Sequence, residues 1–187
     1  MFHPLKRVVL PVAIAGFLGA GLLAPLSAFA ELPANVKAKV ETYKKKLVEW
    51  GANPTIVKAV KEANAKGGEL PGMTNSKWDE LENNSPQVVG LLSSPASKLV
   101  AQWEKDKNVS KVYVRDDKGN LVAASNKALL FNNASRPPFK AAIKGEVFNA
   151  NEVKPDPTTQ VKSVQISAPV LDGGKPIGII HSAVTVE

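Results

Sequence analysis

The last third of the chain, residues 109–187, most constrains the fold, because apolar residues alternate there and Gly-containing turns separate the runs. The apolar run Val112–Val114 precedes Asp116–Asn120, and Leu121–Ala124 follow. Asp and Gly at this spacing suit a hairpin loop, with the glycine in the left-handed region. A second turn lies at Asp172–Lys175. The segment therefore predicts an antiparallel sheet built around two hairpins.

A loop and a short helix separate these hairpins. The loop runs over Ser125–Ser135, and Arg136 leads through two prolines into the expected helix Phe139–Lys144, which Gly145 ends. Pro169 predicts a strand end or an edge position, since proline cannot donate to a ladder. The remaining expected strands are Val147–Val153, Gln160–Val170 and Ile177–Val186.

The N-terminal half is expected to be helical. Apolar residues recur every three or four positions over Asn35–Trp50, opposite a lysine-rich face. Asn53–Lys66 and Ser94–Trp103 each start with a capping residue followed by proline. The order of elements predicts an α+β fold, in which the N-terminal helices of residues 31–108 pack beside a five-stranded antiparallel sheet of residues 109–187.

Residues 1–30 have the composition of a secretory signal. Lys6 and Arg7 form a basic start, an apolar run begins at Val8, and Ala28–Ala30 offers small residues at the cleavage positions. An uncleaved anchor is the alternative, because the run is long enough to cross a bilayer. We expect cleavage after Ala30 and a periplasmic mature protein.

Composition excludes several chemistries. The chain has no cysteine and two histidines, one of them inside the expected leader. Disulfides, thiolate metal sites and c-type haem are therefore excluded, and a single remaining histidine argues against a metal site or a catalytic triad. Lys and Arg exceed Asp and Glu by 24 to 17, but no dense basic run contains interleaved aromatics. We expect no enzyme activity, no cofactor and no nucleic-acid partner.

Three segments in this order resemble the Cache domains, which are extracytoplasmic relatives of PAS sensors. They are the hairpin Val109–Ala124 with its Asp-x-x-Gly turn, the Arg-x-x-aromatic-x-x-Ala-x-x-Gly helix of Arg136–Gly145, and the hairpin Val164–Val184. The resemblance covers about residues 47–186. It implies a single, stand-alone secreted Cache domain that binds a small molecule and relays its occupancy to a separate membrane histidine kinase, cyclase or chemoreceptor.

The resemblance also places a ligand against the sheet, under the loop and helix that follow the first hairpin. Arg136 is the first candidate, because a guanidinium can bind a carboxylate bidentately; an exposed loop arginine is the alternative. Phe139 stands where relatives often carry Tyr or Trp, although the two prolines before it depart from the family pattern and Phe139 could equally be core. Tyr113, Asn133 and His181 complete the predicted ligand site, each with a purely structural alternative.

The closing strand limits the ligand class. Amino-acid-binding relatives carry an Asp that holds the ligand's ammonium group, and that position falls near Ala183 in this chain. We therefore expect a small anionic metabolite, a carboxylate, rather than an amino acid. The competing hypothesis is a structural interaction module whose cavity is filled by core side chains and whose N-terminal helices mediate a homodimer.

Overall fold

A computed structural model describes residues 31–186 of the chain, so the expected signal sequence and its cleavage site lie outside the described residues. The helices are α1 (Ala34–Gly51), α2 (Pro54–Lys66), α3 (Asn75–Asp79), α4 (Pro86–Leu92), α5 (Pro95–Trp103) and α6 (Pro137–Ala142). The strands are β1 (Val109–Asp116), β2 (Leu121–Ala124), β3 (Phe148–Asn149), β4 (Lys154–Pro155), β5 (Lys162–Asp172) and β6 (Lys175–Thr185). No helix within residues 31–186 is long and apolar enough to cross a bilayer.

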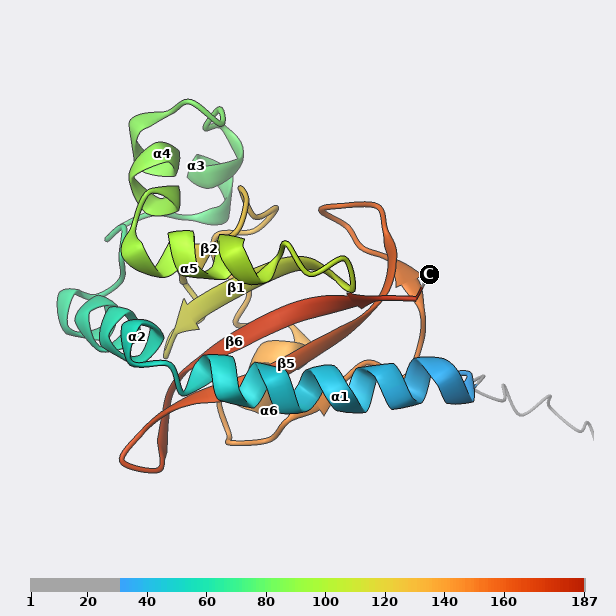
Figure 1. The fold of residues 1–187 in the computed structure, drawn as a ribbon. Helices are drawn as coiled ribbons and strands as arrows, with labels where there is room; N and C mark the ends of the chain where they lie inside the picture. Colours follow the sequence, from blue (N-terminus) through green and yellow to red (C-terminus); the bar gives the residue numbers. More distant parts are fainter. Residues whose placement is uncertain (1–30, 187) are drawn as a thin grey trace, which may run out of the picture.

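The strands form one antiparallel sheet in the order β2-β1-β6-β5-β3, and β4 also pairs with β5. The two long strands β5 and β6 form the C-terminal hairpin, and β6 lies against β1 (Figure 1). The register aligns Tyr113, His181 and Ser167 in one row across β1, β6 and β5. The expected α+β architecture is confirmed.

Two expectations for the sheet are refined. Residues 147–153 do not form one strand but contribute the two-residue strand β3, after which bends at 151–152 lead to β4. Pro169 lies inside β5, beyond the last residue that β3 pairs, which is Ser167. At Pro169 the strand pairs only with β6 among the described strands, so the missing N–H breaks no ladder.

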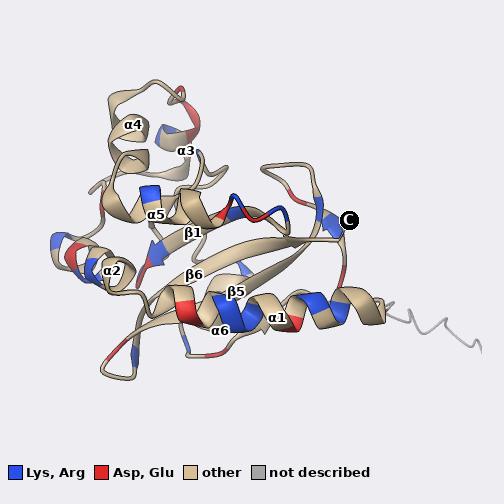
Figure 2. Ribbon diagram, viewed as in Figure 1, with Lys and Arg blue, Asp and Glu red and all other residues tan. Residues whose placement is uncertain are grey.

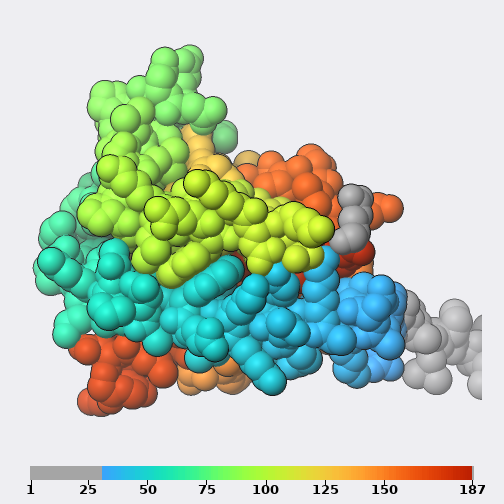
Figure 3. Space-filling model, viewed as in Figure 1, coloured from blue at the N-terminus to red at the C-terminus, as the bar shows by residue number. Residues whose placement is uncertain are grey.

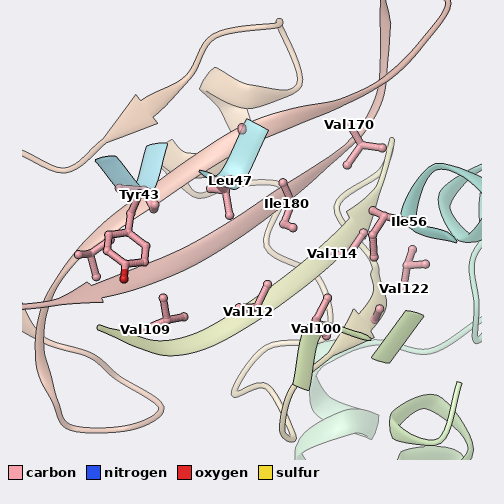
Figure 4. Packing of buried hydrophobic residues seen from close by; sticks show 14 of the residues in the cluster. Tyr43, Leu47, Ile56, Val100, Val109, Val112, Val114, Val122, Val170 and Ile180 are labelled. Atoms are coloured by element: carbon pink, nitrogen blue, oxygen red, sulfur yellow. The ribbon is translucent and has the colours of Figure 1, made fainter. Parts of the chain in front are cut away.

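Helices α1, α2 and α5 cover one face of the sheet (Figures 1 and 3). Leu47, Ile56 and Val100 of these helices enter one apolar cluster with Val114 and Ile180 of the strands (Figure 4). Removing each such side chain from water contributes roughly 1.5–3 kcal/mol to stability. The apolar residues that recur every three to four positions in the helices thus pack against the alternate apolar residues of the strands, as the sequence pattern predicts.

The helix starts follow from local chemistry. Asn53 Oδ1 accepts a hydrogen bond from Thr55 N at 2.9 Å, and Ser94 Oγ accepts one from Ser97 N at 3.1 Å. Proline occupies the first turn of both helices, where its missing N–H leaves no bond unmade. Both predicted starts are confirmed.

The last turns of α1 and α5 lie side by side (Figure 3). There Trp50 and Trp103 stack with ring centroids 4.9 Å apart and planes 4° apart. Tyr43 OH donates to Asp106 Oδ2 at 2.6 Å, which ties α1 to the segment after α5. These contacts join the two helices that cover the sheet.

Helices α3 and α4 form a lobe next to the β1–β2 end of the sheet (Figure 1). Trp78 is fully buried in it, and its Nε1 donates to Ala128 O at 2.7 Å. Phe131 packs against the Trp78 ring at a centroid distance of 5.5 Å. The lobe therefore fixes the loop that follows β2 over the sheet.

Two glycines permit close backbone approaches around β1. Gly119, at φ +83°, forms the tip of the first hairpin, and a Cβ there would lie 2.8 Å from Ala134 N. A Cβ on Gly178 would lie 2.3 Å from Arg115 O. Neither position has room for a side chain, so both glycines help to place Arg115 and the loop above it.

Candidate functional site

A cavity of about 530 Å³ lies on the face of the sheet opposite α1. Val112 and Val114 of β1 point toward the helices, so the alternating residues Lys111, Tyr113 and Arg115 point into the cavity. The remaining walls come from the loop 128–138, the segment 148–158 and the facing residues of β5 and β6. The volume falls in the range usual for small-molecule sites.

Arg115 is the central charged group of the cavity floor, and it is 2% exposed. Its Nη1 donates to the carbonyl oxygens of Gly119 (3.1 Å) and Phe131 (2.6 Å), and Nη2 donates to that of Leu130 (3.0 Å). Its Nε donates to His181 Nε2 at 3.1 Å. All four partners are neutral, and one of its five N–H groups has no protein partner among the described residues.

The contact with Arg115 fixes the protonation of His181. Arginine Nε carries a hydrogen and can only donate, so His181 Nε2 must accept with its lone pair. The neutral ring therefore carries its proton on Nδ1. His181 is 5% exposed, and Nδ1 has no hydrogen-bond partner among the described residues. The ring of this cavity-lining residue thus carries a buried N–H that no group of residues 31–186 accepts.

Lys111 is the second buried cation, and it is paired. Its Nζ lies 2.5 Å from Oδ2 of Asp156, which belongs to the loop between β4 and β5. Asp156 Oδ1 also accepts from the backbone N–H groups of Thr158 and Thr159, at 2.9 and 3.1 Å. Among the ion pairs of residues 31–186, this is the one with both side chains buried. The ion pair joins β1, on the floor of the cavity, to the β4–β5 loop.

Three buried polar atoms of the described residues have no hydrogen-bond partner: Asn133 Oδ1, Ser163 Oγ and His181 Nδ1. All three residues line this cavity. Buried polar atoms in folded proteins are normally satisfied, and leaving one unpaired costs about 1–3 kcal/mol. Their concentration around one cavity marks it as a place where a bound molecule or solvent completes the hydrogen bonding.

The electrostatic balance of the cavity is positive. Burial lowers the pKa of Arg115 to about 9, so the guanidinium remains charged at neutral pH. Burial also lowers the pKa of Lys111, although Asp156 opposes the shift. Burial, followed by the charges of Arg115 and Lys111, holds the pKa of His181 well below 6.5. Burial is the largest cause of all three shifts, and repulsion between the cations adds to the shifts of Lys111 and His181, which an anion would relieve.

Four of the five sequence-predicted site residues line the cavity. Tyr113 and His181 lie on its floor, with ring centroids 5.3 Å apart, and Asn133 lies on its wall. Arg136 lies at the rim with an exposed side chain that has no hydrogen bond or ion pair within residues 31–186. Phe139 instead packs with Ala142 and Ile179 and is not among the lining residues.

Sequence reasoning missed Lys111, Arg115, Ser163 and Asp156 as site residues. The alternation along β1 contains the signal for the first two, because they flank Tyr113 at a period of two on the face away from Val112 and Val114. Asp156 carries no such signal, since it stands between two prolines in an irregular segment.

Ala183 of β6 is the position at which an acid was looked for, and the carboxylate of Asp156, from the loop between β4 and β5, lies near it. Ala183 pairs with Gln165 of β5, and Gln165 Nε2 lies 3.4 Å from Asp156 Oδ2. Asp156 thus reaches the β5 residue that pairs with Ala183, but Lys111 already neutralises it. Within residues 31–186 no group of three His, Asp or Glu side chains could hold a metal ion.

The antiparallel sheet, with helices on one face and a loop and short helix over a polar cavity on the other, is the fold of the Cache-type sensor domains. Among solved structures, the chain is similar to the sensor domain of the V. cholerae histidine kinase DctB, with a TM-score of 0.57 and 18% identity. That similarity covers 81% of this chain and 51% of the other, so this chain spans about half the length of the DctB domain. At this identity the likeness establishes the fold alone.

Two further structures are more distant. The sensory domain of the Campylobacter jejuni chemoreceptor Tlp3 with isoleucine bound has a TM-score of 0.41 at 12% identity, covering 82% of this chain and 64% of that one. The ligand-binding domain of the Pseudomonas aeruginosa chemoreceptor PctC with GABA has a TM-score of 0.44 at 17% identity, covering 82% and 56%. Both scores are too low to carry an argument. No protein-family model and no curated protein matches the sequence.

Proposed function

We propose that this protein is a non-enzymatic extracytoplasmic sensor that binds a small anionic molecule, a carboxylate, in the cavity above β1, β5 and β6. The observation that carries the proposal is the set of unpartnered buried atoms around the cavity, next to a guanidinium that has only neutral partners. A carboxylate accepts hydrogen bonds from N–H and O–H groups and supplies the missing negative charge. Arg115 and His181 Nδ1 are the donors that this proposal uses for the carboxylate. Ser163 pairs with Thr185, four residues along β6 from His181, so Ser163 Oγ is a donor for another polar group of the ligand.

The relay is the second part of the proposal. Occupancy passes by protein contact to a membrane histidine kinase, cyclase or chemoreceptor, and the N-terminal helices provide a homodimer surface. The helix α1 carries five Lys and two Glu, and Lys and Arg predominate along it in Figure 2. Because like charges repel less when salt screens them, a dimer built on α1 is expected to strengthen with ionic strength, which sedimentation equilibrium measures.

The structural-module alternative requires a cavity filled by core side chains. The cavity instead has about 530 Å³ of open volume, and its buried polar atoms are not turned toward protein partners. A module without a ligand gives no physical reason for these unpartnered atoms to belong to residues around one cavity. We therefore favour the ligand-binding function.

The test is calorimetry and thermal shift with a panel of organic acids, using a matched pair of serines on β5. Ser163 Oγ has no partner, so Ser163→Ala removes no bond from the folded protein and should leave its stability unchanged, while it weakens about three- to tenfold the acids whose second polar group reaches β5. Ser167 Oγ donates to Pro138 O at 2.7 Å, so Ser167→Ala should instead lower stability by about 1 kcal/mol.

The variant Arg136→Ala tests whether the charge at the rim of the cavity contributes to anion binding. An exposed cation at the mouth attracts anions through solvent, so its loss should weaken binding severalfold at low salt and less at high salt. The proposal fails if no acid of the panel binds or raises the melting temperature. The site assignment fails if acids bind but Ser163→Ala and Arg136→Ala leave the affinity unchanged.

A further inference from the structure

The buried side chains that line the cavity carry one more positive charge than negative charge. Two cations, Lys111 and Arg115, and one carboxylate, Asp156, are buried in its walls. Asp156 pairs with Lys111, whereas every hydrogen-bond partner of Arg115 is neutral. Asp116, the next residue along β1, is not a lining residue and accepts hydrogen bonds from its own hairpin turn at Lys118 N and Asn120 N. Its charge favours the charged form of Arg115 through space but makes no hydrogen bond to it. The cavity therefore has a place for one anionic group.

Part of the cavity lining is apolar and comes mostly from the loop after β2: Ala128, Leu129, Leu130, Pro137, Pro138 and Phe148. Exposed polar residues, Arg136, Asn151, Glu152 and Lys154, line the cavity as well. Leu129 is 52% exposed, more than any other large hydrophobic side chain of residues 31–186. An exposed leucine at the rim of a cavity provides apolar area that a ligand can remove from water.

We infer that the ligand is a monocarboxylate with an uncharged, apolar body, whose carboxylate meets Arg115 and His181 and whose body lies against Leu129 and its apolar neighbours. This inference rests on the proposed function and narrows its ligand class. A second carboxylate deep in the cavity would meet Lys111, which Asp156 already neutralises. At the rim it would meet only exposed cations, Arg136 and the paired Lys154, whose attraction water and salt screen. An ammonium group would meet two buried cations and an aspartate that Lys111 occupies.

Three acids with the same six-carbon chain separate these cases by calorimetry: hexanoate, hexanedioate and 2-aminohexanoate. Hexanoate is expected to bind at least tenfold more tightly than either of the others. Along the series from butanoate to octanoate, affinity should rise about fourfold per added CH₂, the value expected for full burial.

The variant Leu129→Ser tests the position of the body. Its control is Leu171→Ser, at a leucine outside the cavity that is 41% exposed against 52% for Leu129. Leu129→Ser should weaken octanoate about tenfold and butanoate much less, since only the longer chain reaches the rim. Leu171→Ser should change neither.

The outcomes distinguish this inference from the proposed function. Equal or tighter binding of hexanedioate or 2-aminohexanoate, a flat chain-length series, or an equal loss for all acids in Leu129→Ser overturns the monocarboxylate assignment and leaves anion binding intact. Absence of binding by every acid overturns both.

Discussion

Replacing Asp156 by Asn removes the charge that faces Lys111 while it keeps the shape of the side chain. The Oδ1 atom of the variant can still accept hydrogen bonds from Thr158 N and Thr159 N, so the turn at the start of the β4–β5 loop retains its bonds. The Oδ2 position becomes an NH₂ group that cannot accept from the Lys111 ammonium. Apart from the long contact that Gln165 Nε2 makes with Oδ2 at 3.4 Å, the variant therefore isolates the ion pair from the loop geometry.

The expected cost follows from burial. The Lys111 and Asp156 side chains are 5% and 0% exposed, and removing one partner of such a pair leaves an uncompensated charge that costs about 3–5 kcal/mol. The exposed pair Lys154–Glu152, at 68% and 57%, is worth less than about 1 kcal/mol. Asp156→Asn should thus destabilise the fold severalfold more than Glu152→Gln.

Urea unfolding at pH 7 measures the difference. With a slope of about 2 kcal/mol per molar urea, a loss of 3 kcal/mol moves the midpoint by about 1.5 M. Burial already lowers the pKa of Lys111 below 10.5, and the loss of Asp156 lowers it further. Between the two pKa values, Lys111 of the folded variant is neutral while Lys111 of the unfolded chain is still protonated. Its deficit should therefore shrink as the pH rises toward 10.

The double variant Lys111→Met with Asp156→Asn should recover most of the loss, because no buried charge then lacks a partner. A cost for Asp156→Asn no larger than that for Glu152→Gln, or no recovery in the double variant, would refute the claim that a buried charge pair closes the cavity.

Two further predictions concern stability. Because burial and the nearby cations hold the pKa of His181 well below 6.5, only the unfolded chain binds the proton as the pH falls below that value. The free energy of unfolding should then drop by up to about 1.4 kcal/mol per pH unit, and His181→Gln, which can still accept from Arg115 Nε, should remove this dependence in urea titrations between pH 5 and 7.5. Gly178→Ala should cost about 1–3 kcal/mol in thermal unfolding, since the new Cβ overlaps Arg115 O. Gly90→Ala in α4, where nothing lies within 4 Å, should stabilise the protein by about 0.5–1 kcal/mol, and a similar gain at Gly178 would contradict the packing described for β6.

The local chemistry of this chain made much of its fold predictable. Asn53 and Ser94 cap helices where their side chains predict it, and Gly119 takes the left-handed conformation expected at the first hairpin tip. The error over residues 147–153 has a different origin. That segment has strand-like composition, but it leaves the sheet after β3 to form a wall of the cavity, and only tertiary contacts specify this course.

The candidate site was predictable in part, since Asn133 and Arg136 were placed over the cavity by the family resemblance and the strand residues are reported by alternation. Tyr113 and His181 face the cavity because alternate residues of one strand share a face. The pairing of Lys111 with Asp156 joins two residues of which one lies in an irregular loop, so no local pattern indicates it. The role of Arg115 depends likewise on three carbonyl oxygens that the conformations of the loops 117–120 and 125–135 bring together.

The three tryptophans divide the molecule into two optically distinct regions. Trp50 and Trp103 stack over the helical face, and parallel indoles at 4.9 Å couple their electronic transitions, so their near-ultraviolet circular dichroism reports the docking of α1 against α5. Trp78 is isolated from that pair, and its indole N–H is bonded to the carbonyl of Ala128, a residue of the cavity wall. Its fluorescence therefore gives an unlabelled readout of the ligand side, and the two signals separate events at the two faces of one sheet.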